Sequence, residues 1–423
     1  MSSNEEWTTY KLKYLCTKIG SGATPRGGKE TYLDEGPYAL IRSQNVLDFF
    51  FSYDGLAFID ESQANQLSNV EVQERDVLLN ITGDSVARVC QVPITLLPAR
   101  VNQHVSIIRT NNTKLIPEYL KYFLLNPKFK SHLLGLASVG ATRNALTKGM
   151  IEDFDINLPP LSTQRRIADI LSALDEKIEL NRQTNATLEA IAQAIFKEWF
   201  VDFNLPVWNY DLNDGMNTMI TSGENHSPSG NQKNHSADGA LPQGWRVGRL
   251  EEIISNFDSK RIPVSSRERE KRKGIYPYYG AASIVDYIDD FLFDGVYLLM
   301  GEDGTVITDD EKPVLQYVTG KFWVNNHAHV LQGKDIFSTE FVYLALKNTN
   351  VKHIVTGAVQ PKINQGNMNS LPVIIPDIET LNTFQNAIKP IFAYVLEVEQ
   401  QSTTLASLRD ALLPKLMSGE VNV

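Results

Sequence analysis

The chain has 423 residues, an apolar fraction of 42% and a formal net charge of −10, which leaves room for two to four globular domains. Two cysteines, Cys16 and Cys90, are too few to cross-link a fold of this size, so a disulfide-rich secreted protein is excluded and a reducing cytoplasm is expected. We find no signal-peptide pattern and no apolar run of membrane-spanning length, so no membrane partner is expected.

The first predicted domain covers residues 1–160, whose net charge is close to zero. This domain can therefore have a local basic surface even though the whole chain is acidic. Its loop SGATPRGGKE (residues 21–30) combines glycines, which permit close backbone approach, with Arg26 and Lys29. Arg42 and Asn45 follow in IRSQNV (residues 41–46). These residues are weak candidates for contacts with DNA phosphates and bases.

A long helix is predicted over residues 161–204, because apolar residues from Ile167 to Trp199 recur at alternating spacings of three and four. Two prolines precede it, and Ser162 or Thr163 can cap it. Asn181 and Asn185 fall in the apolar seam, where a buried amide costs stability but fixes register and partner.

Residues 205–241 are rich in Asn, Ser and Gly and predict a flexible linker. A second domain, residues 242–376, follows and contains the basic stretch SKRIPVSSREREKRKGIYPYYGA (residues 259–281). Seven basic groups face two acidic ones there, and three tyrosines follow at once. This composition favours contact with DNA, and a solvated charged loop beside core aromatics is the alternative.

The last predicted element is a second long helix within residues 377–423, in which Pro390 predicts a kink or a short first piece. A helix of forty residues spans roughly 60 Å and would expose an apolar stripe if it stood alone. We therefore expect the two helices to pack on each other as an antiparallel coiled coil, rather than each on its own domain.

The two halves of the chain resemble each other. VNQH (residues 101–104) recurs as VNNH (residues 324–327), and residues 140–161 align without a gap on residues 357–378 at an offset of 217. Each copy then enters a long helix. The chain is thus predicted to be one structural unit written twice.

Sequence signatures of catalysis are missing. We find no methyltransferase tetrapeptide of the Asp-Pro-Pro-Tyr type, no P-loop and no zinc spacing. Asp-x-Lys at residues 175–177 and 310–312 is interpreted as ordinary surface charge, and GEDG (residues 301–304) as a turn at a strand end rather than a metal site. His104, His327 and His329 are interpreted as structural.

With these motifs in view, the chain resembles the specificity subunit of type I restriction-modification systems over nearly its whole length. LPPLSTQRRIADILSALDEKIELNRQ (residues 158–183) and AIFKEWFVDF (residues 194–203) look like that family's central helix, and residues 408–421 like its C-terminal helix end. Residues 274–305 look like a variant of its second target-recognition domain. QRR at residues 164–166 departs from the family's usual acidic residue followed by Gln.

The resemblance implies an α+β fold, with two tandem mixed α/β target-recognition domains, each followed by a long helix. It implies that each domain reads one half of a split, asymmetric DNA site and that the helices set the gap. Expected partners are double-stranded DNA, two modification subunits and the restriction or translocase subunits. Catalytic residues, cofactors and metals are not expected in this chain; S-adenosylmethionine, ATP and Mg are expected in the partners.

Two alternatives remain: the specificity partner of a type IIB-like enzyme, and a coiled-coil scaffold that does not bind DNA. The candidate residues fall into two groups. The predicted DNA contacts are Arg26, Lys29, Arg42, Asn45, Arg143, Lys260, Arg261, Arg267, Arg272, Tyr278 and Lys362. The predicted helix-pairing or subunit-docking residues are Ile167, Leu174, Ile178, Asn181, Asn185, Leu188, Ile195, Ile388, Val395, Leu405 and Leu412.

Overall fold

The structure is a computed structural model that describes residues 7–138, 144–205, 207–210, 217–220, 241–357 and 359–423. The chain forms two compact units: Met1–Gln183 with Glu399–Val423 (unit 1), and Thr184–Val398 (unit 2). Each unit holds one α/β core and a section of both long helices. The division therefore runs through the helices instead of at their starts. Among the described helices, none is long and apolar enough to cross a membrane.

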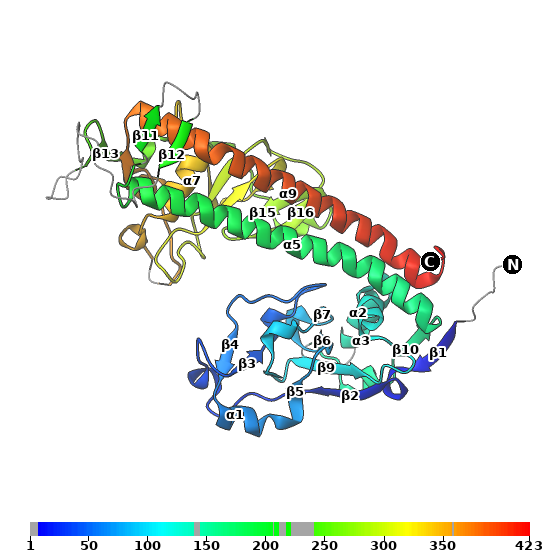
Figure 1. Cartoon of the computed structure of the whole chain (residues 1–423). Coiled ribbons are helices and arrows are strands. Elements are labelled where there is room, and N and C mark those ends of the chain that lie inside the picture. Colours follow the sequence, from blue (N-terminus) through cyan, green and yellow to red (C-terminus); the bar gives the residue numbers. More distant parts are fainter. Residues whose placement is uncertain (1–6, 139–143, 206, 211–216, 221–240, 358) are drawn as a thin grey trace. The chain divides into compact units, whose positions relative to one another are not determined.

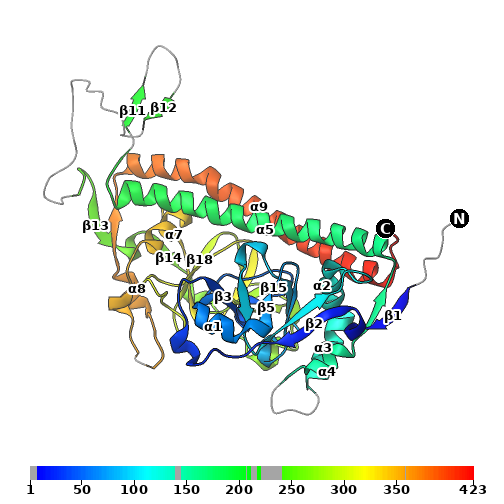
Figure 2. The same ribbon diagram turned by 60° about the horizontal axis from the view of Figure 1, so that its bottom comes forward.

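The core of unit 1 contains two four-stranded sheets and a two-stranded ribbon (Figure 2). The first sheet has the order β2-β9-β6-β7, the second β4-β3-β8-β5, and the ribbon pairs β1 with β10. The strands are β1 (Thr8–Lys11), β2 (Cys16–Ser21), β3 (Tyr38–Ile41), β4 (Ala57–Ile59), β5 (Glu71–Val72), β6 (Val77–Asn80), β7 (Val89–Gln91), β8 (Ala99–Val101), β9 (Val105–Thr110) and β10 (Asp155–Leu158). The helices are α1 (Glu61–Gln66), α2 (Pro117–Leu125), α3 (Pro127–Ser138) and α4 (Lys148–Glu152).

Unit 2 repeats this topology. Its sheets have the orders β14-β21-β18-β19 and β16-β15-β20-β17, and its ribbon pairs β13 with β22. The strands are β13 (Arg246–Arg249), β14 (Ile254–Asn256), β15 (Lys273–Tyr279), β16 (Ile284–Ile288), β17 (Phe293–Asp294), β18 (Tyr297–Gly301), β19 (Leu315–Val318), β20 (Lys321–Val324), β21 (Ala328–Gly333) and β22 (Pro372–Ile375). The helices are α6 (Ser266–Arg269), α7 (Thr339–Lys347) and α8 (Gln365–Asn369).

The repeat predicted from the sequence is confirmed strand by strand, down to the one parallel pair in each second sheet, β3 with β8 and β15 with β20. The repeated tetrapeptide VNxH is a side-chain turn in both copies. Asn102 Oδ1 accepts a hydrogen bond from the His104 amide at 3.0 Å, and Asn325 Oδ1 accepts one from the His327 amide at 2.8 Å. The asparagine therefore replaces a backbone acceptor at the entry to β9 and β21.

Apolar strands hold both cores together. All four residues of β6 are buried, and β18 has four buried residues in succession, because both strands lie in the middle of their sheets. Unit 2 adds an aromatic cluster at the end of the first long helix, where Phe200 lies 4.8 Å from Phe384 and 5.3 Å from Trp245 between ring centroids. The segment AIFKEWF thus serves as core packing.

The two long helices are α5 (Leu161–Phe200) and α9 (Ile378–Ser418), and they pair antiparallel (Figure 1). In unit 1 the Asn181 amide donates to Gln401 Oε1 at 2.8 Å and to Ser402 Oγ at 3.1 Å. In unit 2 Asn185 donates to the Val395 carbonyl at 3.3 Å. From Asn181 to Asn185 along α5, the bonded residues of α9 run backwards in sequence, which shows that the two helices are antiparallel.

Two details of the helices differ from expectation. Helix α9 continues through Pro390 without a break, so the predicted short first piece is wrong. Proline removes one backbone hydrogen bond of the helix, and the packing of α9 on α5 stabilises the helix despite this loss. Asp175 is not an ordinary surface charge, because its carboxylate is 12% exposed and ion-paired with Lys121 at 3.1 Å and Arg409 at 3.0 Å. The eleven predicted pairing residues are all buried or half-buried.

The predicted linker lies mostly outside the described residues. Its described parts are β11 (Val207–Tyr210) and β12 (Asn217–Ile220), which pair antiparallel. A composition rich in Asn and Gly does not indicate this hairpin, whose strands contain the few β-prone residues of the segment.

Candidate nucleic-acid interface

The ends of four strands meet along one edge of unit 1, and the loops that leave them form what we call the loop rim of unit 1 (residues 22–30, 42–45, 81–88 and 102–104). The Gly22 amide donates to the Asn102 carbonyl at 3.1 Å, and the Asn102 amide to the Ile41 carbonyl at 3.0 Å. The Ile81 amide donates to the His104 carbonyl at 2.9 Å. These bonds join loops from β2, β3, β6 and β8 into one surface.

Gly22 is required at this edge. A Cβ built on it would lie 1.7 Å from the Val101 carbonyl oxygen, which no side chain can tolerate. The glycine-rich loop is further fixed by Thr24, whose hydroxyl donates to Gln103 Oε1 at 2.6 Å. The two sequence signals of the first half, SGATPRGGKE and VNQH, are therefore neighbours in space.

Four of the five predicted DNA contacts of unit 1 lie within the described residues, and these four fall into three classes of burial. Arg26 and Lys29 are exposed on the rim. Arg42 is half-buried: its guanidinium donates to the Gly55 carbonyl and lies 5.2 Å from the centre of the Tyr32 ring. Asn45 is fully buried, and Arg143 lies outside the described residues.

Asn45 has a role inside the protein. Its Oδ1 accepts from the Arg42 amide at 3.0 Å, and its Nδ2 donates to the carbonyls of Ser52 at 3.0 Å and Asp54 at 3.2 Å. The amide thus shapes the loop between β3 and β4 that carries Arg42. Since the Asn45 side chain has no exposed surface, we interpret it as a structural residue of this loop and not as a DNA contact.

In unit 2 the basic stretch divides sharply by pairing. Four of its seven cations are neutralised within the domain: Arg261 by Glu302 at 2.6 Å, Arg269 and Lys273 by Asp286 at 3.1 and 2.6 Å, and Arg272 by Asp289 at 2.9 Å. The other three, Lys260, Arg267 and Lys271, are exposed and have no carboxylate at ion-pair distance within the described residues. Composition alone could not make this distinction.

Tyr278 is also internal. It is 1% exposed, its hydroxyl accepts from the Val264 amide at 3.0 Å, and the Arg269 guanidinium lies 4.8 Å from the centre of its ring. The tyrosine and Arg269 together hold the basic stretch against the hairpin of β15 and β16. We therefore interpret Tyr278 as a support of the basic surface rather than part of it.

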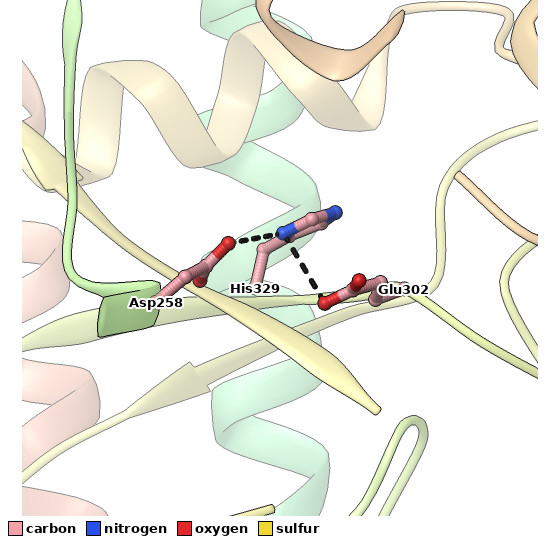
Figure 3. A group of neighbouring side chains, drawn as sticks. All are labelled: Asp258, Glu302 and His329. Atoms are coloured by element: carbon pink, nitrogen blue, oxygen red, sulfur yellow. Dashed lines mark hydrogen bonds and ion pairs between the residues drawn. The ribbon is translucent and has the colours of Figure 1, made fainter. Parts of the chain in front are cut away.

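A compact charged cluster joins Arg261 of the basic stretch to Asp258, Glu302, His329 and Lys362 (Figure 3 shows three of them). His329 Nδ1 lies 2.6 Å from Asp258 Oδ2 and 3.7 Å from Glu302 Oε2. Its Nε2 lies 2.8 Å from the Ile363 carbonyl oxygen. The ring is fully buried, and each of its nitrogens lies within hydrogen-bond distance of an oxygen of the same unit.

Asp258, Glu302 and His329 are of the type that binds metals, and they are the one such group found in the described part of the chain. Here the protein supplies its own cations. Arg261 bonds to Glu302, and Lys362 Nζ lies 3.7 Å from the same carboxylate. Burial acts to raise the pKa of Asp258, but hydrogen bonds from His329, the Val330 amide and Asn256 outweigh it and lower the pKa below its usual value. We therefore assign a structural role to the cluster.

Sequence reasoning missed a hollow on the loop rim of unit 1 that is lined by polar residues and a glycine. It has a volume of about 380 Å³ and is lined by Ser43, Gln44, Thr82, Gly83, Asp84, Ser85, Arg88 and His104. Its lining comes from three separate segments, residues 43–44, 82–88 and 104, so no local sequence pattern indicates it. In unit 2, GEDG (residues 301–304) begins at the last residue of strand β18 and turns as expected, because Gly304 has a φ of +88°.

Comparison with known proteins gives a consistent result. The profile of the family described as "type I restriction modification DNA specificity domain" matches residues 4–190 and 242–404. The MjaIX type I specificity subunit of Methanocaldococcus jannaschii is 25% identical over 99% of this chain and 94% of that protein. The HindI specificity subunit of Haemophilus influenzae is 25% identical over 76% of this chain and 81% of that protein.

Among solved structures, the S subunit of a type I restriction-modification system from M. genitalium superimposes with a TM-score of 0.51. The superposition covers 98% of this chain and 97% of that one at 14% sequence identity. This likeness supports the fold.

Proposed function

Because the chain belongs to the family of type I restriction-modification DNA specificity domains, we propose that it is the specificity subunit of such a system. Units 1 and 2 would each bind one half of a split site in double-stranded DNA. The observation that carries this proposal is the strand-by-strand repeat: two cores of equal topology have loops of different sequence between matching strands. Two scaffolds of the same topology can bind DNA in the same way, and loops of different sequence can read different half-sites.

The DNA site is then asymmetric, since a palindrome needs two equal readers. We propose that α5 and α9 act as a spacer that sets the unspecified gap. Two recognition surfaces about one helical turn apart, roughly 35 Å, can contact the same face of DNA. Helices of 40 and 41 residues are long enough for that task.

We further propose that this chain is a non-catalytic subunit and that the chemistry resides in its partners. Two modification subunits would bring S-adenosylmethionine and flip an adenine out of each half-site. Restriction or translocase subunits would bring ATP and Mg. The long helices offer surfaces for such docking, because Ile170, Ile191, Tyr394 and Leu408 project apolar side chains that are 38 to 50% exposed.

The direct test is genome-wide detection of methylated adenine in cells that carry the modification partner, with and without this gene. A gapped, asymmetric motif that appears only with the gene is expected. A second strain should carry residues 242–376 from another member of the family, and only one half of the motif should then change. A motif that is independent of the gene contradicts the proposal, and a change in both halves contradicts modular reading.

A further inference from the structure

The polar hollow of unit 1, formed by the eight residues named above, has a lining suited to a specific ligand. Every lining residue is polar or glycine, and the hollow opens on the same rim as Arg26 and Lys29. Asp84 is exposed and Arg88 is half-buried, and within the described residues neither has an ion-pair partner. Two opposite charges that are close in sequence but unpaired are available to something outside the protein.

Hydrogen bonds from other segments hold the backbone that presents these side chains. Asn80, which is fully buried, donates from Nδ2 to the Ser43 carbonyl at 2.8 Å and so fixes the segment before Asn45. Gly83 has a φ of +74°, and its amide donates to the Asn144 carbonyl at 3.1 Å. Thr82 bonds to the His104 ring. Side chains held on such a frame can read a ligand with little cost of ordering.

The mixture of groups decides which part of DNA fits. A phosphate offers only acceptors and a negative charge, so a carboxylate in the hollow would repel it. Base edges offer donors and acceptors side by side, and the common pairings are Arg with guanine, Gln with adenine and Asp with cytosine. Arg88, Gln44 and Asp84 supply these three side-chain types in one hollow.

Unit 2 contains the same backbone with other side chains. Gly304 has a φ of +88°, and its amide donates to the Pro361 carbonyl at 2.9 Å, as Gly83 does to Asn144. The residues on either side of this glycine differ between the copies: Thr82 and Asp84 in unit 1 correspond to Asp303 and Thr305 in unit 2. A kept frame with exchanged side chains is what two readers of different half-sites require.

We infer that the polar hollow of unit 1 reads base edges of one half-site, with Arg88 as donor and with Asp84 and Gln44 Oε1 as acceptors. The Gln44 Nε2 atom already donates to the Gly55 carbonyl at 3.2 Å. This inference rests on the proposed function and names the readers within it. Arg26 and Lys29 on the same rim would contact phosphates, which hold the DNA without reading it.

The test uses the full chain in complex with its modification subunits and a duplex library in which each position of the methylated motif is varied. Arg88→Ala, Arg88→Lys and Asp84→Asn should each relax base preference at one or two positions of a single half-site. Affinity for the original site should fall about 5- to 150-fold. Lys148→Ala is the control, because Lys148 is exposed on α4 and lines no part of the hollow.

The outcomes separate the inference from its premise. Unaltered preference at every position in the Arg88 and Asp84 variants, with unaltered melting temperature, overturns the inference. Equal loss of affinity for all duplexes also overturns it, because it marks a phosphate contact. If the unmodified complex itself shows no gapped motif, the proposed function fails and the inference fails with it.

Discussion

Arg261 Nη1 lies 2.6 Å from Glu302 Oε2, and both side chains are almost enclosed, at 13% and 15% exposure. Arg261 also donates to the Ala328 carbonyl at 2.7 Å. Arg261, which the sequence predicts as a DNA contact, therefore connects the basic stretch to Glu302 and to strand β21. Replacement of Arg261 by Glu would therefore reduce DNA binding by destabilising unit 2, even if Arg261 does not contact DNA.

We predict that Arg261→Glu lowers the free energy of unfolding by about 3–5 kcal/mol, because it leaves Glu302 buried beside a like charge. Denaturant unfolding followed by tryptophan fluorescence measures this loss. The double variant Arg261→Glu with Glu302→Arg should recover part of it. An unfolding curve equal to that of the unmodified protein would show that the pair contributes nothing.

The exposed cations Lys260, Arg267 and Lys271 should behave differently. Each replacement by Ala is predicted to leave the melting temperature unchanged and to reduce the slope of log K against log salt by about 0.9, provided the residue contacts one phosphate. Titration of the complex with its cognate duplex at several salt concentrations measures the slope. Arg249→Ala is the control, because Arg249 is exposed on β13, away from this stretch in sequence. An unchanged slope in all three variants would remove the stretch from the interface.

Much of the architecture could be predicted from the sequence, because the signals are local or repeated. The spacing of Ile167, Leu174 and Ile178 predicts α5 and its seam, and the two VNxH copies predict the repeat. The ion pairs of the basic stretch could not be predicted, because the carboxylates that pair with its cations lie far away in the sequence. Glu302 is 41 positions from Arg261, and Asp286 is 17 positions from Arg269. Burial of Asn45 and Tyr278 likewise depends on loops and sheets that close over them.

Acid should weaken unit 2 through Asp258, whose pKa is lower in the folded protein than its ordinary value. An aspartate of this kind adds stability above its unfolded pKa of about 3.9, and this stability is lost as pH falls through the lower folded pKa. We predict that the unfolding free energy falls between about pH 5 and pH 2, and that Asp258→Asn, although less stable at pH 7, shows a shallower fall. Equal slopes in both proteins would exclude Asp258 as a source.

Asn181 tests the polar layer of the helix pair. The side chain is 2% exposed and bonds to Gln401 and Ser402. Asn181→Leu is predicted to raise the melting temperature, because an apolar residue replaces a desolvated amide, and to admit other registers or extra oligomers. Calorimetry and light scattering after gel filtration measure the two effects. A variant that is less stable and strictly unchanged in mass would show that the amide contributes net stability instead of specificity.

The outer faces of α5 and α9 give the last prediction. Tyr394 is 50% exposed and Ile191 is 45% exposed, and both lie on helices within unit 2. We predict that Tyr394→Arg with Ile191→Glu leaves the melting temperature unchanged, because neither side chain is enclosed, and reduces co-purification of the modification subunit at least tenfold. Val359→Glu is the control, since Val359 is 99% exposed on a loop instead of a helix. Full co-purification of the helix variant would place the docking surface elsewhere, whereas equal loss in the control would indicate a general effect of added charge.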